Sequence, residues 1–246
     1  MNTFTKYAAL AVVASLTAAS PALADSMLFN AADIGKSVSL NYNGYDSNGG
    51  SSIAGLTGST TFTLTGVSGN DYTFDYAVAN TSSAPVIDSR ISGFAFNTDP
   101  EITGANSTGA YSYAQLSGNY PNGIGTVDVC FKDASTGACA GGGSGGLTAG
   151  QTGTGTFTLS FASPVSALTL GNFFVRYQSI SGVPGVSSAT GDGTISSTSG
   201  GSTSGGSTGG TPVPEPGMLG LFGAGIIGLA LARRRRQTVR VQFAAA

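Results

Sequence analysis

The sequence predicts an all-β protein whose central part forms a single β-sandwich of jelly-roll-like type. Glycine, serine and threonine are abundant, with 39 glycines among 246 residues, a composition that disfavours helices. Apolar and polar residues alternate with period two in several short stretches, the pattern of half-buried strands. Outside two terminal apolar segments, no window shows helical periodicity. Short strands with glycine-rich turns favour two packed sheets, and a closed barrel is the alternative.

Residues 1–24 have the features of a secretory signal peptide. A positively charged start precedes an apolar stretch from 7 to 19, which is short for a membrane span. Ala22 and Ala24 provide the small side chains that signal peptidase requires, so we expect cleavage before Asp25. An uncleaved N-terminal anchor is the alternative interpretation.

The predicted outer domain covers residues 25–190 and contains about eight candidate strands. These are residues 37–42, 60–67, 72–78, 93–96, 126–131, 156–161, 167–170 and 173–177. In residues 72–78, large apolar side chains alternate with polar ones, so one face of the strand is expected to be buried. Residues 68–71, Ser-Gly-Asn-Asp, predict a hairpin turn between two of these strands.

The charge distribution of the outer part excludes several classes of function. Between residues 25 and 211 there are eleven acidic and four basic residues, a net charge of −7, and such a surface repels nucleic-acid phosphates. Histidine is absent, which removes the usual general base and the commonest metal ligand. We therefore expect no enzyme activity, no metal and no cofactor. Asp99 and Glu101 are the carboxylate pair that a carbohydrate-active enzyme would use in the alternative interpretation.

Cys130 and Cys139 are expected to form a disulfide, because an exported protein meets an oxidising compartment. Alternation along 126–131 places Cys130 opposite the core-facing residues, so the bond would join a strand end to the next loop. Two cysteines without histidine offer too few ligands for a metal, and a reactive thiol pair is the remaining alternative. The glycine run at 141–146 is expected to be a mobile surface loop, with an anion-binding cradle as the alternative.

The C-terminal part of the chain divides into four segments. Residues 191–211 are almost wholly glycine, serine and threonine and predict a flexible linker. A proline-rich segment follows, and residues 218–232 predict a short transmembrane helix. The basic cluster at 233–236 is expected to remain cytoplasmic, which leaves the preceding domain outside. Residues 237–246 form a final tail. The basic cluster consists of Arg233, Arg234, Arg235 and Arg236.

The motif Val213-Pro214-Glu215-Pro216, followed by a glycine-rich helix and a basic cluster, resembles the PEP-CTERM sorting signal of Gram-negative bacteria. The resemblance covers residues 212–236. It implies that exosortase processes the chain, typically in species that make exopolysaccharide. A plain membrane anchor that is never cut is the alternative.

The outer domain also resembles the cistern family of PEP-CTERM proteins. The resemblance rests on four blocks, residues 91–100, 121–131, 139–143 and 172–178. No reaction is known for this family, so the resemblance assigns no active site.

These features together predict an exported surface or extracellular-matrix protein with a structural or adhesive role. Its expected partners are signal peptidase, exosortase, the membrane before processing, and exopolysaccharide. We expect an intermediate anchored in the inner membrane and then a location at the cell surface, outer envelope or matrix. The alternative is a carbohydrate-active or calcium- or glycan-binding module, for which Asn41, Asn43, Asp46 and Asn48 would offer oxygen ligands.

Overall fold

The computed structural model describes residues 25–46, 50–142 and 145–200, and these form twelve strands and two short 3-10 turns. The strands are β1 (Ser26–Asn30), β2 (Ser37–Tyr45), β3 (Ser52–Ser68), β4 (Asp71–Asn80), β5 (Asp88–Asp99), β6 (Gly104–Ser107), β7 (Tyr113–Tyr120), β8 (Gly125–Lys132), β9 (Leu147–Thr148), β10 (Thr152–Ser160), β11 (Ala167–Ser181) and β12 (Ser188–Ser199). The turns are η1 (Ala31–Asp33) and η2 (Gly109–Tyr111). The predicted all-β class is therefore confirmed.

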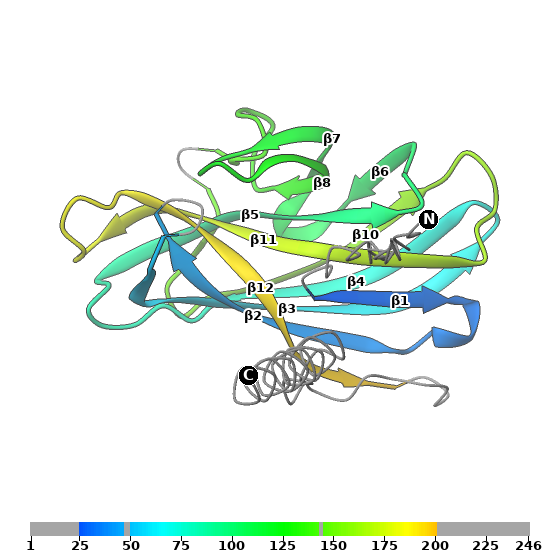
Figure 1. Ribbon diagram of the computed structural model, residues 1–246, viewed down its shortest axis with the longest axis horizontal. Coiled ribbons are helices and arrows are strands. Elements are labelled where there is room, and N and C mark those ends of the chain that lie inside the picture. Colours follow the sequence, from blue (N-terminus) through cyan, green and yellow to red (C-terminus); the bar gives the residue numbers. More distant parts are fainter. Residues whose placement is uncertain (1–24, 47–49, 143–144, 201–246) are drawn as a thin grey trace, which may run out of the picture. The chain divides into compact units, whose positions relative to one another are not determined.

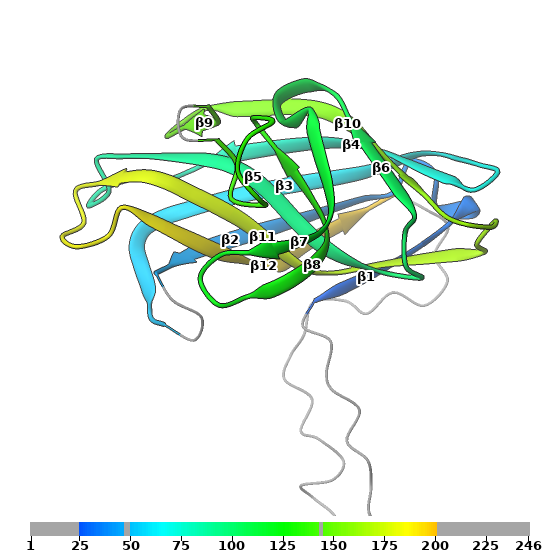
Figure 2. The same ribbon diagram turned by 90° about the horizontal axis from the view of Figure 1, so that it is seen from above.

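The strands form one continuous antiparallel sheet rather than two separately hydrogen-bonded sheets (Figure 1). Their order is β6-β10-β4-β3-β2-β12-β11-β5-β8-β7, with β1 paired to β11 and β9 paired to β5. The sheet bends over so that β5 and β11 lie across from β3 and β4, and its two ends, β6 and β7, approach each other (Figures 1 and 2). The result is a sandwich-like, nearly closed arrangement of two layers.

Aromatic side chains fill the space between the two layers. Phe62 on β3 has its ring centroid 5.5 Å from that of Phe94 and 5.8 Å from that of Phe96, both on β5. It also contacts Phe157 on β10 and Phe173 on β11, at 5.6 and 6.0 Å. Because β3 and β5 are not neighbours in the sheet, these contacts must cross the core. Aromatic burial of this kind supplies large apolar area to a small domain.

The strands predicted by alternation are present, with two of them merged. Residues 167–170 and 173–177 belong to the single strand β11, which continues through a register shift between Gly171 and Phe174. Asn172 lies in that bulge with a left-handed φ of 52°, a conformation that asparagine tolerates better than most residues. The hairpin predicted at 68–71 is confirmed, because Ser68 pairs with Asp71 across a two-residue turn.

The predicted boundary at residue 190 is wrong, because Ser188–Ser199 forms β12 between β2 and β11. The residues up to Ser199 therefore belong to the sheet and not to the predicted linker at 191–211. The glycines of β12 explain how this strand fits between its neighbours in the sheet. A Cβ on Gly191 would lie 3.0 Å from Cβ of Tyr42 and from Cε2 of Tyr177, so the missing side chain is what lets these two tyrosines pack on β12.

Several predicted segments lie outside the described residues. They are the signal peptide at 1–24, the linker beyond residue 200, the sorting signal at 212–236 with its helix at 218–232, and the tail at 237–246. Within the described residues, no helix is long and apolar enough to span a membrane.

Candidate functional site

The residues predicted for sorting and processing lie outside the part of the chain that the structure describes. They are Ala22, Ala24, Val213, Pro214, Glu215, Pro216, Arg233, Arg234, Arg235 and Arg236. Asp25, the residue before which cleavage is predicted, lies within the described range. A carboxylate oxygen of Asp25 accepts a hydrogen bond from the backbone N–H of Ile195 at 3.3 Å, and Ser26 pairs with Gly171.

The predicted disulfide between Cys130 and Cys139 is confirmed. Both cysteines are fully buried, in a second small apolar cluster apart from the main core. Ala95 belongs to the same cluster, and its neighbours on β5 face the main core, so this cluster lies on the opposite side of β5. As predicted, the bond joins β8 to the loop that follows it rather than crossing the main core.

Lys132 holds the loop that the disulfide closes. Its ammonium group donates to the carbonyl oxygen of Gly137 at 2.7 Å and to Oε1 of Gln115 at 3.1 Å. Burial lowers the pKa of Lys132, and the neighbouring Asp133 carboxylate partly opposes that shift. Hydrogen bonds to the neutral oxygens of Gly137 and Gln115 therefore hold the Lys132 ammonium group in place.

Gly141, Gly142 and Gly145, from the glycine run at 141–146, lie close to the Asp133 carboxylate of the protein itself. The N–H of Gly142 donates to Oδ1 of Asp133 at 2.9 Å, and Gly145 approaches Asp133 so closely that a side chain there would collide with it. Gly141 and Gly142 are buried, so this part of the run is not the mobile surface loop that we expected. Residues 143–144 lie outside the described range.

The outer surface of β2, β3, β4 and β10 carries regular rows of small and mostly polar side chains, which we call the hydroxyl face. One row joins Thr156, Asp75, Thr63 and Ser37, which are direct partners across the strands. Thr156 donates to Asp75 at 2.9 Å, and the hydroxyls of Ser37 and Thr63 are 2.7 Å apart.

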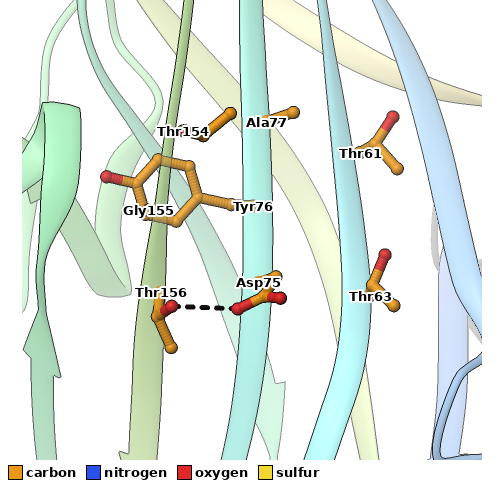
Figure 3. A pocket seen from close by; sticks show the side chains of 8 residues that line it. All are labelled: Thr61, Thr63, Asp75, Tyr76, Ala77, Thr154, Gly155 and Thr156. Carbon is orange, nitrogen blue, oxygen red and sulfur yellow. Dashed lines mark hydrogen bonds between the residues drawn. The ribbon is translucent and has the colours of Figure 1, made fainter.

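A second row lies two residues along each strand and joins Thr154, Ala77, Thr61 and Ser39. The hydroxyls of Thr61 and Ser39 are 3.0 Å apart. Figure 3 shows the members of both rows on β10, β4 and β3 around a shallow depression of about 430 Å³. Sequence alternation indicated a polar face on each strand, but only the pairing register shows that these residues form rows.

A second depression, which we call the Phe174 pocket, has a volume of about 330 Å³. Its lining includes Asn97, Ile124, Thr126, Asn172, Phe174 and Asp192. Asp192 accepts a hydrogen bond from the hydroxyl of Tyr45 at 2.8 Å, and Oδ1 of Asn97 accepts one from the backbone of Asp128 at 3.0 Å. The sequence does not predict this pocket, because its residues come from strands β5, β8, β11 and β12 and from the turn before β8.

The other candidate residues are dispersed. Asp99 and Glu101 are exposed at the end of β5 and just beyond it. Asn41 and Asn43 are exposed on β2. Asp46 follows that strand, and Asn48 lies outside the described range. Among the described residues, no group of three or more acidic or cysteine side chains comes together as possible metal ligands.

Comparison with known proteins identifies one segment of the chain. A family model described as the PEP-CTERM protein-sorting motif matches residues 212–236. The match covers the same segment as the resemblance carried by the Pro-Glu-Pro motif, and the cistern resemblance of the outer domain stays a prediction. Comparisons with curated proteins and with solved structures found no match.

Proposed function

We propose that this chain, which carries the PEP-CTERM sorting motif, is a structural and adhesive surface protein that associates with exopolysaccharide. The motif at 212–236 implies an exported protein that exosortase sorts, anchored in the membrane before processing and surface-associated afterwards. The β-rich body is then the part that meets the extracellular matrix. We propose that it acts by binding and not by catalysis.

The observation that carries this proposal is the hydroxyl face. Serine and threonine hydroxyls both donate and accept hydrogen bonds, so they suit a polymer whose surface is itself covered with hydroxyls. Neighbouring strands lie about 4.8 Å apart and alternate residues of one strand about 6.6 Å apart, so the face repeats in two directions. A repeating polymer can make many weak contacts with such a surface at once, and their combined strength exceeds that of any one contact.

The hydrogen bonds within the face favour this role. The pairs Ser37–Thr63 and Ser39–Thr61 orient one another's hydroxyls at 2.7 and 3.0 Å, which lowers the entropy lost when a ligand binds. Asp75 is the acidic member of the rows, and its carboxylate accepts a hydrogen bond from Thr156. The face therefore suits a neutral polymer better than an acidic one.

The test compares retention of the full-length chain on the exopolysaccharide of the producing cell. The variant Thr61→Val with Thr154→Val removes two hydroxyls of the face and keeps the side-chain shape. Thr103→Val is the matched control, because Thr103 is an exposed threonine that lies outside the rows. We expect retention to fall for the double variant and to stay unchanged for the control.

Equal retention of all three chains would exclude the hydroxyl face as the contact surface. Absence of retention for the unmodified chain, together with a normal matrix in a deletion strain, would refute the adhesive role. Sorting is tested separately by the intact mass of the native protein, which should lack the residues beyond about Pro216 if exosortase cuts the tail.

A further inference from the structure

We infer that the Phe174 pocket is a binding site for a single unit of a neutral saccharide. The choice of ligand class rests on the proposed function, but the residues differ from those of the hydroxyl face. The two surfaces can therefore be tested independently.

The pocket offers an apolar surface of the kind that packs against the C–H face of a sugar ring. Phe174 is half-buried, and its ring centroid lies 5.6 Å from that of the buried Tyr120. Ile124 packs against the same small cluster and also lines the pocket. The ring of Phe174 is thus supported from behind and partly open to solvent. A volume of about 330 Å³ lies at the small end of the usual range for ligand sites.

Polar groups stand around this apolar surface. Asp192 uses one carboxylate oxygen for the hydroxyl of Tyr45 and is an exposed residue, so it can accept from a sugar hydroxyl. The amide of Asn172 lines the pocket from the bulge in β11, and bulges often redirect a side chain towards a functional site. Asn97 and Thr126 contribute an amide and a hydroxyl. An apolar surface bordered by amides and one carboxylate matches the amphipathic ring of a neutral sugar.

Unpartnered polar atoms on three residues that adjoin the pocket lining, without lining the pocket themselves, provide a second, independent observation. Phe174 pairs with Asp192 across β11 and β12, and the next pair on the same side of these strands is Arg176 with Thr190. Within the described residues, Nε of Arg176, Oγ1 of Thr190 and the hydroxyl of Tyr120 are buried without a hydrogen-bond partner. Buried polar atoms are normally satisfied by protein, water or ligand. Because these atoms are enclosed and their residues do not line the pocket, an internal water that bridges them to a sugar hydroxyl would complete this group.

The charge around the pocket favours a neutral ligand over an acidic one. Asp192 borders the pocket, and the Asp128 carboxylate lies nearby, where it accepts from the backbone N–H of Thr98 at 2.7 Å. The guanidinium of Arg176 is buried and donates to Asn122 and to the carbonyl oxygen of Ala189. It is therefore not presented to a carboxylate or sulfate group of an acidic sugar.

The test measures binding of maltotetraose, cellotetraose and mannotetraose to the full-length chain in a zwitterionic detergent, by saturation-transfer NMR and titration. Asn172→Gly removes the amide while glycine keeps the left-handed backbone, so the fold is preserved. Asp192→Asn removes the carboxylate but leaves an acceptor for Tyr45. Asp71→Asn is the matched control, because Asp71 is an exposed acid on β4 and does not line the pocket.

We expect at least one tetrasaccharide to bind and each pocket variant to weaken that binding about tenfold, as loss of a hydrogen bond to a ligand does. The control should bind like the unmodified chain. Binding that the pocket variants leave unchanged would overturn this assignment. If no tetrasaccharide binds while the whole polymer is still retained through the hydroxyl face, the pocket inference fails and the proposed function stands. If neither tetrasaccharide nor polymer binds, both fail.

Discussion

A single methyl group added to β12 should destabilise the protein if this strand belongs to the core. In Gly193→Ala, the new Cβ would lie 2.7 Å from Cε1 of Tyr42 and 2.8 Å from Cβ of Phe173. Both neighbours are almost fully buried, and the Tyr42 hydroxyl is held 2.9 Å from that of Thr60. The ring therefore cannot turn away freely. Overpacking of this kind costs about 1–3 kcal/mol of the free energy of unfolding.

The matched control is Gly66→Ala in β3. A Cβ on Gly66 would have its nearest neighbour, Cβ of Thr73, at 4.0 Å, so there is space for it. An alanine in such a position commonly raises stability by about 0.4–1 kcal/mol, because it restricts the unfolded chain. Urea unfolding followed by circular dichroism measures both changes. We expect a lower midpoint for Gly193→Ala, an equal or higher one for Gly66→Ala, and similar slopes.

Equal midpoints for the two variants would refute this reasoning. They would indicate that residue 193 is not packed against the core, and that the linker begins at residue 191 as the composition of the sequence suggested.

Three further predictions concern the core and the disulfide. Phe62→Ala should lower the free energy of unfolding by about 3–5 kcal/mol in urea unfolding, because the ring touches four others across the core; a loss below about 1 kcal/mol would contradict that packing. Replacement of both Cys130 and Cys139 by alanine should cost about 2–3 kcal/mol by thermal or urea unfolding, and a reducing agent should lower only the stability of the unmodified chain. Burial raises the pKa of Tyr111 and Tyr120 well above 10. The stability they contribute is therefore complete below about pH 10, the unfolded pKa, and is lost as the pH rises towards the folded values. Tyrosinate absorbance should then increase together with unfolding, and ionisation of both groups in a folded chain would exclude this mechanism.

The sequence predicted those strands that alternate large and small side chains. β4 is the clearest case, since Tyr72, Phe74, Tyr76 and Val78 all point into the core. β12 has the same alternation in the structure, but its core positions are Ala189, Gly191 and Gly193. These residues carry almost no apolar signal, because the volume at that place is supplied by the rings of the neighbouring strands. A pattern of hydrophobic residues therefore cannot detect this strand.

The candidate sites also differ in how far the sequence alone can predict them. The disulfide and the sorting signal are local in sequence, and both could be predicted from spacing and residue type. The hydroxyl face depends on register, because a slip of one residue between β3 and β4 would separate Thr63 from Asp75. The Phe174 pocket depends on a bulge and on contacts between β5, β11 and β12. Such long-range pairings cannot be read from a single sequence.

The position of β12 in the sheet determines how the body would bear mechanical load. The chain leaves the sheet at Ser199 and continues towards the sorting signal, so a pull on the tail enters the body through this strand. β12 is hydrogen-bonded to β2 on one side and to β11 on the other. A force along the strand would have to shear both ladders together, instead of opening bonds one at a time as at a sheet edge. We expect a high unfolding force in single-molecule pulling from the C-terminal side, a quantity set by the rate of unfolding rather than by equilibrium stability.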